Sequence, residues 1–110
     1  MSPYTFLESI DSEIQIPESG MQSKRLWNDD SGKVVAFGFA AGHELSAHTA
    51  PYPVVLYFVK GEAEVTLGTE KKIAGAGTLV HMPAKLIHSV KATTPTVMLL
   101  LMFKTAVPTA

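Results

Sequence analysis

The sequence contains no cysteine, which excludes several kinds of chemistry at once. Without thiols the chain cannot form a disulfide scaffold, a cysteine-ligated zinc site or an iron–sulfur cluster, and it has no cysteine nucleophile. Charge is also scarce, because only 17% of the residues are charged, against about a quarter in an average soluble domain. The net charge is −1 and indicates no concentrated basic face, so we expect no nucleic-acid partner.

Long hydrophobic runs are missing as well. The longest apolar run covers residues 97–103, whereas a membrane-spanning helix needs about 18 to 20 apolar residues. The first residues show no basic segment followed by an apolar block, so we expect no secretory signal. The sequence therefore predicts a cytoplasmic protein with no membrane partner.

The chain has 110 residues, 46% of them hydrophobic, which is enough for one domain with its own core. We predict a single domain over residues 1–110. The low charge and the apolar faces of segments 34–40 and 97–103 suggest that a second subunit covers part of the surface. We therefore predict a homodimer in which one face of each segment lies inside the domain and the other contacts the second subunit.

Short apolar runs separated by glycine, proline, asparagine or aspartate predict an all-β protein. The sequence Asn-Asp-Asp-Ser-Gly at residues 28–32 indicates a hairpin turn. Residues 6–16 fit helical spacing only weakly and are limited by Pro17, so no helix is predicted there. The expected strands are 24–27, 33–39, 43–48, 54–59, 62–67, 70–73, 78–82, 88–92 and 97–103.

Four histidines are the conspicuous chemical groups of the chain. An isolated histidine in a strand is most often a partly buried or surface residue with one hydrogen bond, and we interpret His43 and His81 in this way. His48 and His88 differ because of the residues that flank them.

One segment has a distinctive spacing of glycine and histidine. Gly42 is followed after five residues by His48, then by Ala50, Val54 and Gly61 at fixed intervals. This spacing resembles the first motif of the cupin family, Gly, five residues, His-x-His, three or four residues, Glu, six residues, Gly. Ala50 replaces the second histidine of that motif and Val54 replaces its glutamate.

A second segment has a related spacing. Gly77 is followed after five residues by Pro83, and then by Lys85, His88 and Ala92. It resembles the second cupin motif, Gly, five residues, Pro-x-Gly, two residues, His, three residues, Asn. Lys85 replaces the glycine of that motif and Ala92 replaces its asparagine.

The resemblance implies an all-β, cupin-type double-stranded β-helix (jelly-roll) barrel. Its motif region spans about residues 42–92, and residues 1–20 would form an accessory segment. In cupins the histidines and glutamate of the first motif and the histidine of the second bind a divalent metal, and here only His48 and His88 carry over. The resemblance thus implies iron, manganese, nickel, zinc or copper at two ligands, whereas a catalytic metal usually has three protein ligands.

A third metal ligand would have to come from His43, His81, Glu44, a methionine or a bound substrate. Of these, His81 is the best placed, because it shortly precedes the turn into His88. His43 and Glu44 precede His48 by several strand residues and should lie well away from it.

The resemblance also implies which side chains point into the barrel. If Val54 points inward, strand alternation places Leu56 and Phe58 on the same face, and Val90 follows inward from His88. An apolar lumen with two neutral imidazoles has the composition of a small-molecule site. The predicted ligand-binding residues are His48, His88, Val54, Leu56, Phe58 and Val90; the other interpretation is that these side chains only fill the barrel.

Three functions remain open at this point. The first is a small single-domain cupin that binds a small organic ligand in the lumen, with or without a divalent metal. The second is a metal-dependent dioxygenase or isomerase with a two-histidine site, and the third is a ligand-sensing or structural module without catalysis. A serine hydrolase is disfavoured because Ser46 and Ser89 have no nucleophile-elbow context.

Overall fold

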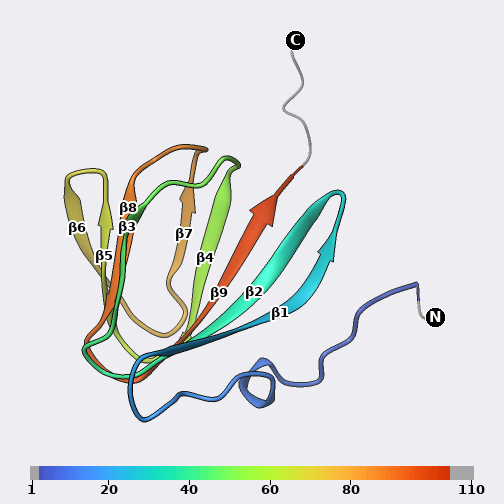
Figure 1. Ribbon diagram of the computed structural model, residues 1–110, viewed down its shortest axis with the longest axis horizontal. Helices are drawn as coiled ribbons and strands as arrows, with labels where there is room; N and C mark the ends of the chain where they lie inside the picture. The colour runs from blue at the N-terminus through green and yellow to red at the C-terminus, as the bar shows by residue number, and fades with distance from the viewer. Residues whose placement is uncertain (1–2, 105–110) are drawn as a thin grey trace.

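The structure is a computed structural model that describes residues 3–104, and it is built almost entirely of β-strands (Figure 1). The all-β prediction is therefore confirmed. Within the described residues the helical element is a single 3-10 turn, η1 (Ile10–Ser12), and no helix is long and apolar enough to cross a membrane. The strands are β1 (Met21–Asp29), β2 (Gly32–Phe39), β3 (Glu44–His48), β4 (Val54–Lys60), β5 (Ala63–Leu67), β6 (Glu70–Ala74), β7 (Leu79–Met82), β8 (His88–Ala92) and β9 (Thr96–Phe103).

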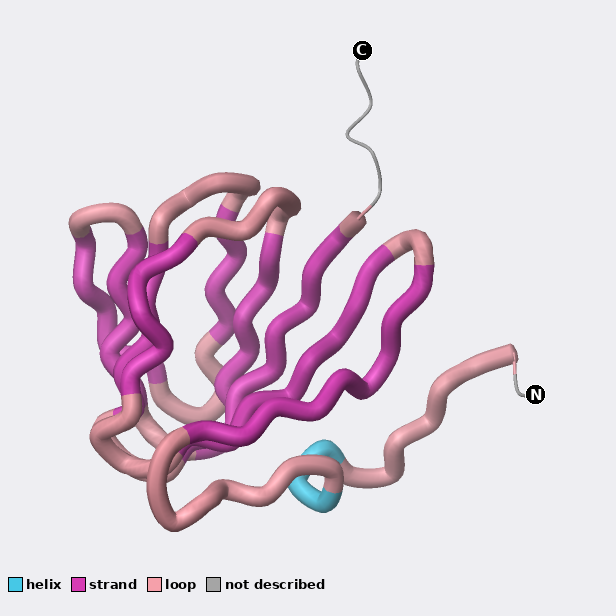
Figure 2. Tube along the Cα trace, in the orientation of Figure 1, coloured by secondary structure: helices cyan, strands magenta, loops and turns pink. Residues whose placement is uncertain are grey.

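The strands form two antiparallel sheets that face each other (Figures 1 and 2). One sheet has the order β1-β2-β9-β4-β7 and the other has the order β3-β8-β5-β6. This alternation between the two sheets along the chain is the jelly-roll arrangement that the motifs imply.

The main hydrophobic core lies between the sheets. Leu56, Phe58 and Met98 from the five-stranded sheet and Val65 and Val90 from the four-stranded sheet are at most 1% exposed and form one cluster. Their alternation with polar or outward residues is the period of two expected for strands. Each such side chain contributes about 1.5–3 kcal/mol by leaving water, so this cluster holds the sheets together.

One end of the barrel carries both histidine motifs, and we call it the histidine end. It comprises the hairpin turn at 30–31 and the loops 49–53 and 83–87. Backbone hydrogen bonds tie these segments to each other and to the end of β9, from Lys85 to Ala50, from Phe103 to Pro53 and from Lys104 to Ser31.

The N-terminal segment covers part of the outer face of the five-stranded sheet (Figure 2). Ile14 is buried against Ala36 and Val97, and Gly38 permits this approach because a Cβ atom there would collide with the backbone oxygen of Gln15. We expected a second subunit over the outer faces of segments 34–40 and 97–103. For this part of the face the expectation is wrong, since the chain's own N-terminal segment occupies it.

Candidate functional site

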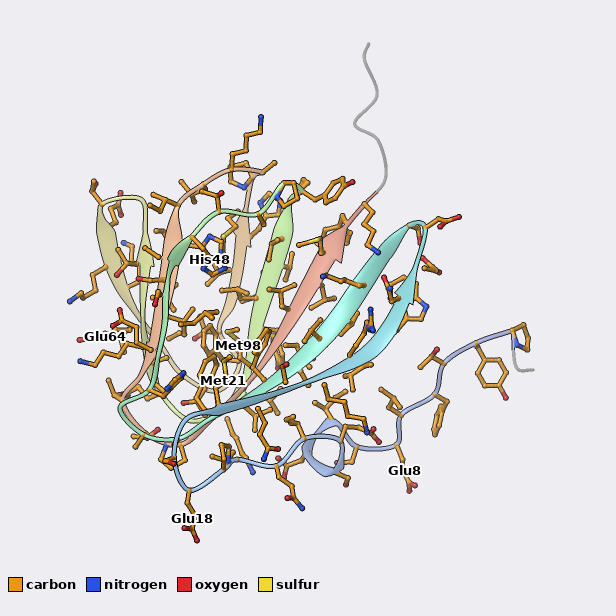
Figure 3. The ribbon with its side chains drawn as sticks, in the orientation of Figure 1. Glu8, Glu18, Met21, His48, Glu64 and Met98 are labelled. Atoms are coloured by element: carbon orange, nitrogen blue, oxygen red, sulfur yellow. The ribbon has the colours of Figure 1, made fainter. Side chains whose placement is uncertain are left out.

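His48 and His88 are brought together by strand pairing. His48 ends β3, His88 begins β8, and the two residues are direct partners across the antiparallel ladder. Their ring centroids lie 4.3 Å apart, with the ring planes tilted by 55°. Figure 3 shows His48 on the side of β3 that faces the space between the two sheets, where Met98 of the opposite sheet also lies. The sequence-predicted pair is therefore one site at the histidine end of the barrel.

Both rings are held by the same local hydrogen bond. His48 Nδ1 lies 2.8 Å from the carbonyl oxygen of Ser46, and His88 Nδ1 lies 2.9 Å from the carbonyl oxygen of Leu86. A carbonyl oxygen can only accept, so each Nδ1 carries the proton and donates it. In the neutral ring the Nε2 lone pair is then free.

These Nε2 atoms are open to a ligand. Among the described residues no buried side-chain nitrogen or oxygen lacks a hydrogen-bond partner. A free Nε2 in this pair must therefore be in contact with solvent, because an isolated buried acceptor is costly. Two solvent-accessible acceptors thus stand side by side against an apolar core.

Burial keeps His88 neutral. Only 3% of the residue is exposed, and this desolvation lowers the pKa of His88 below its ordinary value. The hydrogen bond to Leu86 opposes the shift and the neighbouring His48 adds to it. At neutral pH the His88 ring is an uncharged hydrogen-bond acceptor.

The predicted apolar lining lies deeper than the histidine pair. Val54, Leu56, Phe58 and Val90 are all in the core cluster and at most 1% exposed, so other side chains already cover them. The apolar surface that remains partly accessible against the same cluster comes from other residues. These are Leu45, Ala50, Leu86, Leu100 and Met102. Alternation could have identified Leu86, two residues before His88, and this contact was missed.

His81 does not join the pair. It is exposed and pairs with Val55, whose neighbour Val54 points into the core. Its side chain therefore lies on the outer face of β7, which does not support the interpretation of His81 as an additional ligand. His43 is also separate, because its ring packs against Phe39 with centroids 6.3 Å apart.

The donor set does not fit the metal that the fold implies. Ala50 and Val54 stand where the motif has a histidine and a glutamate, and neither side chain can donate to a metal. Among the described residues no group of three histidine, cysteine, aspartate or glutamate side chains could hold an ion. Two imidazoles are fewer ligands than a catalytic metal needs, so the pair alone does not make a metal centre.

Lys85 links the two motifs at the histidine end. Its backbone has a φ of 71°, a left-handed conformation that favours the glycine found at this motif position. Its N–H donates to the carbonyl oxygen of Ala50 over 2.8 Å, so the strained residue joins the loop before β4 to the loop before β8. Both loops carry residues that flank the histidine pair.

A groove of about 370 Å³ lies elsewhere, between the N-terminal segment and the outer face of β1 and β2. Its lining offers apolar surface and one hydroxyl but no titratable group, so it supplies no proton-transfer chemistry. The lining residues are Thr5, Leu7, Ile10, Leu26, Trp27 and Val34.

Comparisons with known proteins agree with this architecture. The profile of the family described as "Cupin domain" matches residues 35–104. A conserved protein of unknown function from Streptococcus pyogenes is 24% identical, with a TM-score of 0.85, and the match covers 96% of this chain and 93% of that one. A cupin superfamily protein from Desulfitobacterium hafniense is 23% identical, with a TM-score of 0.83 and coverage of 92% and 93%.

An RmlC-like cupin from Shewanella frigidimarina is 21% identical, with a TM-score of 0.77 and coverage of 88% of this chain and 89% of that one. Identities this low show a shared fold alone. None of the curated proteins compared with this chain matches it.

Proposed function

This chain belongs to the cupin domain family, and we propose that its barrel binds a small organic molecule beside His48 and His88. One observation carries the proposal. In both rings Nδ1 donates to a backbone carbonyl and Nε2 is free, and the two tilted rings lie side by side at the histidine end. Two adjacent acceptors against an apolar wall are the polar anchor of a typical small-molecule site.

The rings would recognise the ligand by hydrogen bonding. In its neutral form each Nε2 accepts a hydrogen bond, so a ligand hydroxyl, amide or ammonium group would be its partner. The partly exposed side chains of Leu100 and Met102 would contact the apolar part of the ligand. Binding would also displace water from the pair, which strengthens each hydrogen bond.

The catalytic alternative gains no support of this kind. A metal-dependent dioxygenase or isomerase needs a third protein ligand, and the described residues offer none beside the pair. A binding protein, whether sensor or carrier, requires only the groups that the structure shows.

NMR of the histidine rings tests the proposal. We expect members of a set of small hydroxyl, amide and amine compounds to shift the ring signals of His48 and His88 and to leave His81 unchanged. His48→Ala and His88→Ala should each weaken binding by about tenfold, because a lost hydrogen bond with an unsatisfied partner costs about 1–3 kcal/mol. His81→Ala is the matched control and should bind as the native chain does.

Two outcomes would contradict the proposal. The first is a complete absence of shifts at the two rings with every compound. The second is a compound that binds with the same affinity when both rings are replaced.

A further inference from the structure

We propose that the ligand of this barrel is an anion, and that its carboxylate or phosphate is held by Arg25, Lys33 and Lys104. The inference rests on the proposed function, because it assigns a charge to the molecule bound beside the histidine pair. It comes from the register of β1, β2 and β9, which places Arg25 and Lys33 on the inner face of the five-stranded sheet, and from the hydrogen bonds that hold Lys104 beside them.

Lys33 lies in a row of inward-facing residues. Val54 and Met82 are direct partners and both belong to the buried core, and Val54 also pairs with Met102. Met102 in turn pairs with Lys33. Directly paired residues project from the same face of a sheet, so the Lys33 side chain starts from the inner face at the histidine end.

Arg25 lies one row further from that end. It pairs with Val35, which pairs with Leu100, which pairs with the buried Leu56. Met21, four residues earlier on β1, packs against the same core and points between the sheets in Figure 3. Strand alternation from Met21 gives the same inner face for Arg25.

A β-bulge brings a second polar residue of β1 to this face. The register shifts between Arg25 and Trp27, so that Asn28 pairs with Lys33 although it lies three residues after Arg25. Such a bulge reverses the phase of alternation. The Lys104 ammonium donates to Asn28 Oδ1 and, over 3.3 Å, to the carbonyl oxygen of Asp29, which places a third cation beside this row.

Among the residues that the structure describes, these cations form no ion pair with a carboxylate. Elsewhere in residues 3–104 four lysines form ion pairs, at Lys24–Glu13, Lys60–Asp11, Lys71–Glu64 and Lys72–Glu70, whereas Lys85 and Lys91 form none. Within the same residues no ion pair involves Arg25, Lys33 or Lys104, although the charge of Lys104 acts on the nearby Asp29 carboxyl. Arg25 and Lys33 are therefore two inner-face charges without an ion-pair partner in this part of the chain, and Lys104 lies beside them. An uncompensated cluster of this kind attracts anions.

The nearest acidic groups in sequence are on the hairpin turn. Asp29 Oδ1 accepts hydrogen bonds from the hydroxyl and the N–H of Ser31 and from the N–H of Gly32. These bonds chiefly lower the pKa of Asp29, and the charge of Lys104 adds the smallest contribution. Asp29 is therefore committed to closing the turn, and Lys104 contacts its backbone oxygen rather than its carboxylate.

The two sheets thus offer complementary parts of one site. The four-stranded sheet supplies the Nε2 acceptors, the inner rows of the five-stranded sheet supply Leu100 and Met102, and its far strands supply the cations. A ligand that satisfies all three has a hydrogen-bond donor at one end, an apolar body and an anionic group at the other.

A matched set of compounds tests whether the site prefers a ligand with a negative charge. 4-Hydroxyphenylacetate, 4-hydroxyphenyl phosphate and 4-(2-hydroxyethyl)phenol share an aromatic body and a phenol hydroxyl that can donate to Nε2, and the last compound, an alcohol, lacks the anion. In an NMR titration at low salt we expect one or both anions to bind at least about fivefold more tightly than the alcohol, as charge-assisted hydrogen bonds exceed neutral ones. The tighter of the two anions identifies the group that the site prefers.

Substitutions then test whether Arg25 and Lys33 bind the anionic group. Arg25→Gln combined with Lys33→Gln should remove the preference for the anions and leave the affinity for 4-(2-hydroxyethyl)phenol unchanged. Lys71→Gln combined with Lys72→Gln removes the same charge from β6 and should keep the preference. If the inner-face variant does not fold, the native chain gives the second measurement, because about 0.5 M salt should reduce the preference by screening.

The outcomes separate the two proposals. Equal binding of the acid and the alcohol, with shifts at His48 and His88, would overturn the anion inference and leave ligand binding intact. A preference for the anions that survives the Arg25 and Lys33 replacements would overturn it too. Shifts at neither ring with any of the three compounds would count against both proposals.

Discussion

The two imidazoles owe their arrangement to backbone groups rather than to each other. Each Nδ1 donates to the carbonyl oxygen two residues earlier, and the strand pairing of β3 with β8 sets the rings against one another. Neither feature depends on the histidine and glutamate that Ala50 and Val54 replace. The pair therefore keeps its geometry although half of the metal-binding motif is missing.

At the residue scale, we predict that stability falls at mildly acidic pH because of His88. Its pKa is lowered in the folded state, so the unfolded chain takes up the proton first as the pH falls. The contribution of the neutral His88 ring to the free energy of unfolding is complete above the unfolded pKa of about 6.5. It is lost as the pH falls from that value toward the lower pKa of the folded state. Because one proton is involved, the free energy of unfolding cannot change by more than about 1.4 kcal/mol per pH unit.

Urea unfolding between neutral pH and pH 5 measures this effect. His88→Gln should flatten the decline, whereas His81→Gln, on the outer face, should follow the native curve. A native chain whose free energy of unfolding stays constant or rises as the pH falls through 6 would show the assignment to be wrong.

At the element scale, the N-terminal segment depends on the absence of a side chain at Gly38. A Cβ atom there would collide with the Gln15 backbone oxygen, which belongs to a chain segment that cannot rotate away. We predict that Gly38→Ala destabilises the protein by about 1–3 kcal/mol, as overpacking commonly does. Amide hydrogen exchange should also accelerate in residues 10–16.

Gly75→Ala is the matched control for this prediction. Nothing lies within 4 Å of a Cβ atom at Gly75, and its φ is not in the left-handed region. Its stability should change by no more than about 0.5 kcal/mol. Equal stabilities for the two variants would indicate that the segment does not dock as described.

The strands were predictable because alternating apolar residues indicate their interiors and turn residues indicate their ends. The turn at residues 28–32 and the alternation in 62–67 gave two hairpins that the structure contains. The docking of the N-terminal segment could not be predicted, because it depends on a long-range contact at Gly38 that no local pattern encodes.

The site was only partly predictable for a related reason. Motif spacing identified His48 and His88, and alternation from Met82 would have placed His81 on the outer face. Arg25 and Lys33 were not identified, because basic residues beside a turn are usually solvated and their position on one face depends on how β1 pairs with β2. Their common face can be read only from the register.

At the scale of the whole molecule, part of the outer face of the five-stranded sheet lies beyond the N-terminal cluster. Val34, Leu101 and Val55 are successive partners across β2, β9 and β4, and His81 continues the row on β7. In the next row Tyr57 and Leu79 are 37% and 61% exposed. We call these six residues the outer strip. The register places no lysine, arginine or carboxylate among them, so contact with a second apolar surface would bury no such charge.

We predict that a second copy of this chain covers the strip and forms a homodimer. A largely apolar strip without lysine, arginine or carboxylate is complementary to itself, and a twofold axis places the same strip on both partners. Light scattering at micromolar concentration should give about twice the 11.8 kDa mass of the chain. Leu79→Glu should convert the dimer to a monomer, since a charge buried at an interface is costly. Ile73→Glu, at a position on β6 that is 63% exposed, should leave the dimer intact; a native chain that is monomeric, or a dimer equally disrupted by both changes, would exclude this interface.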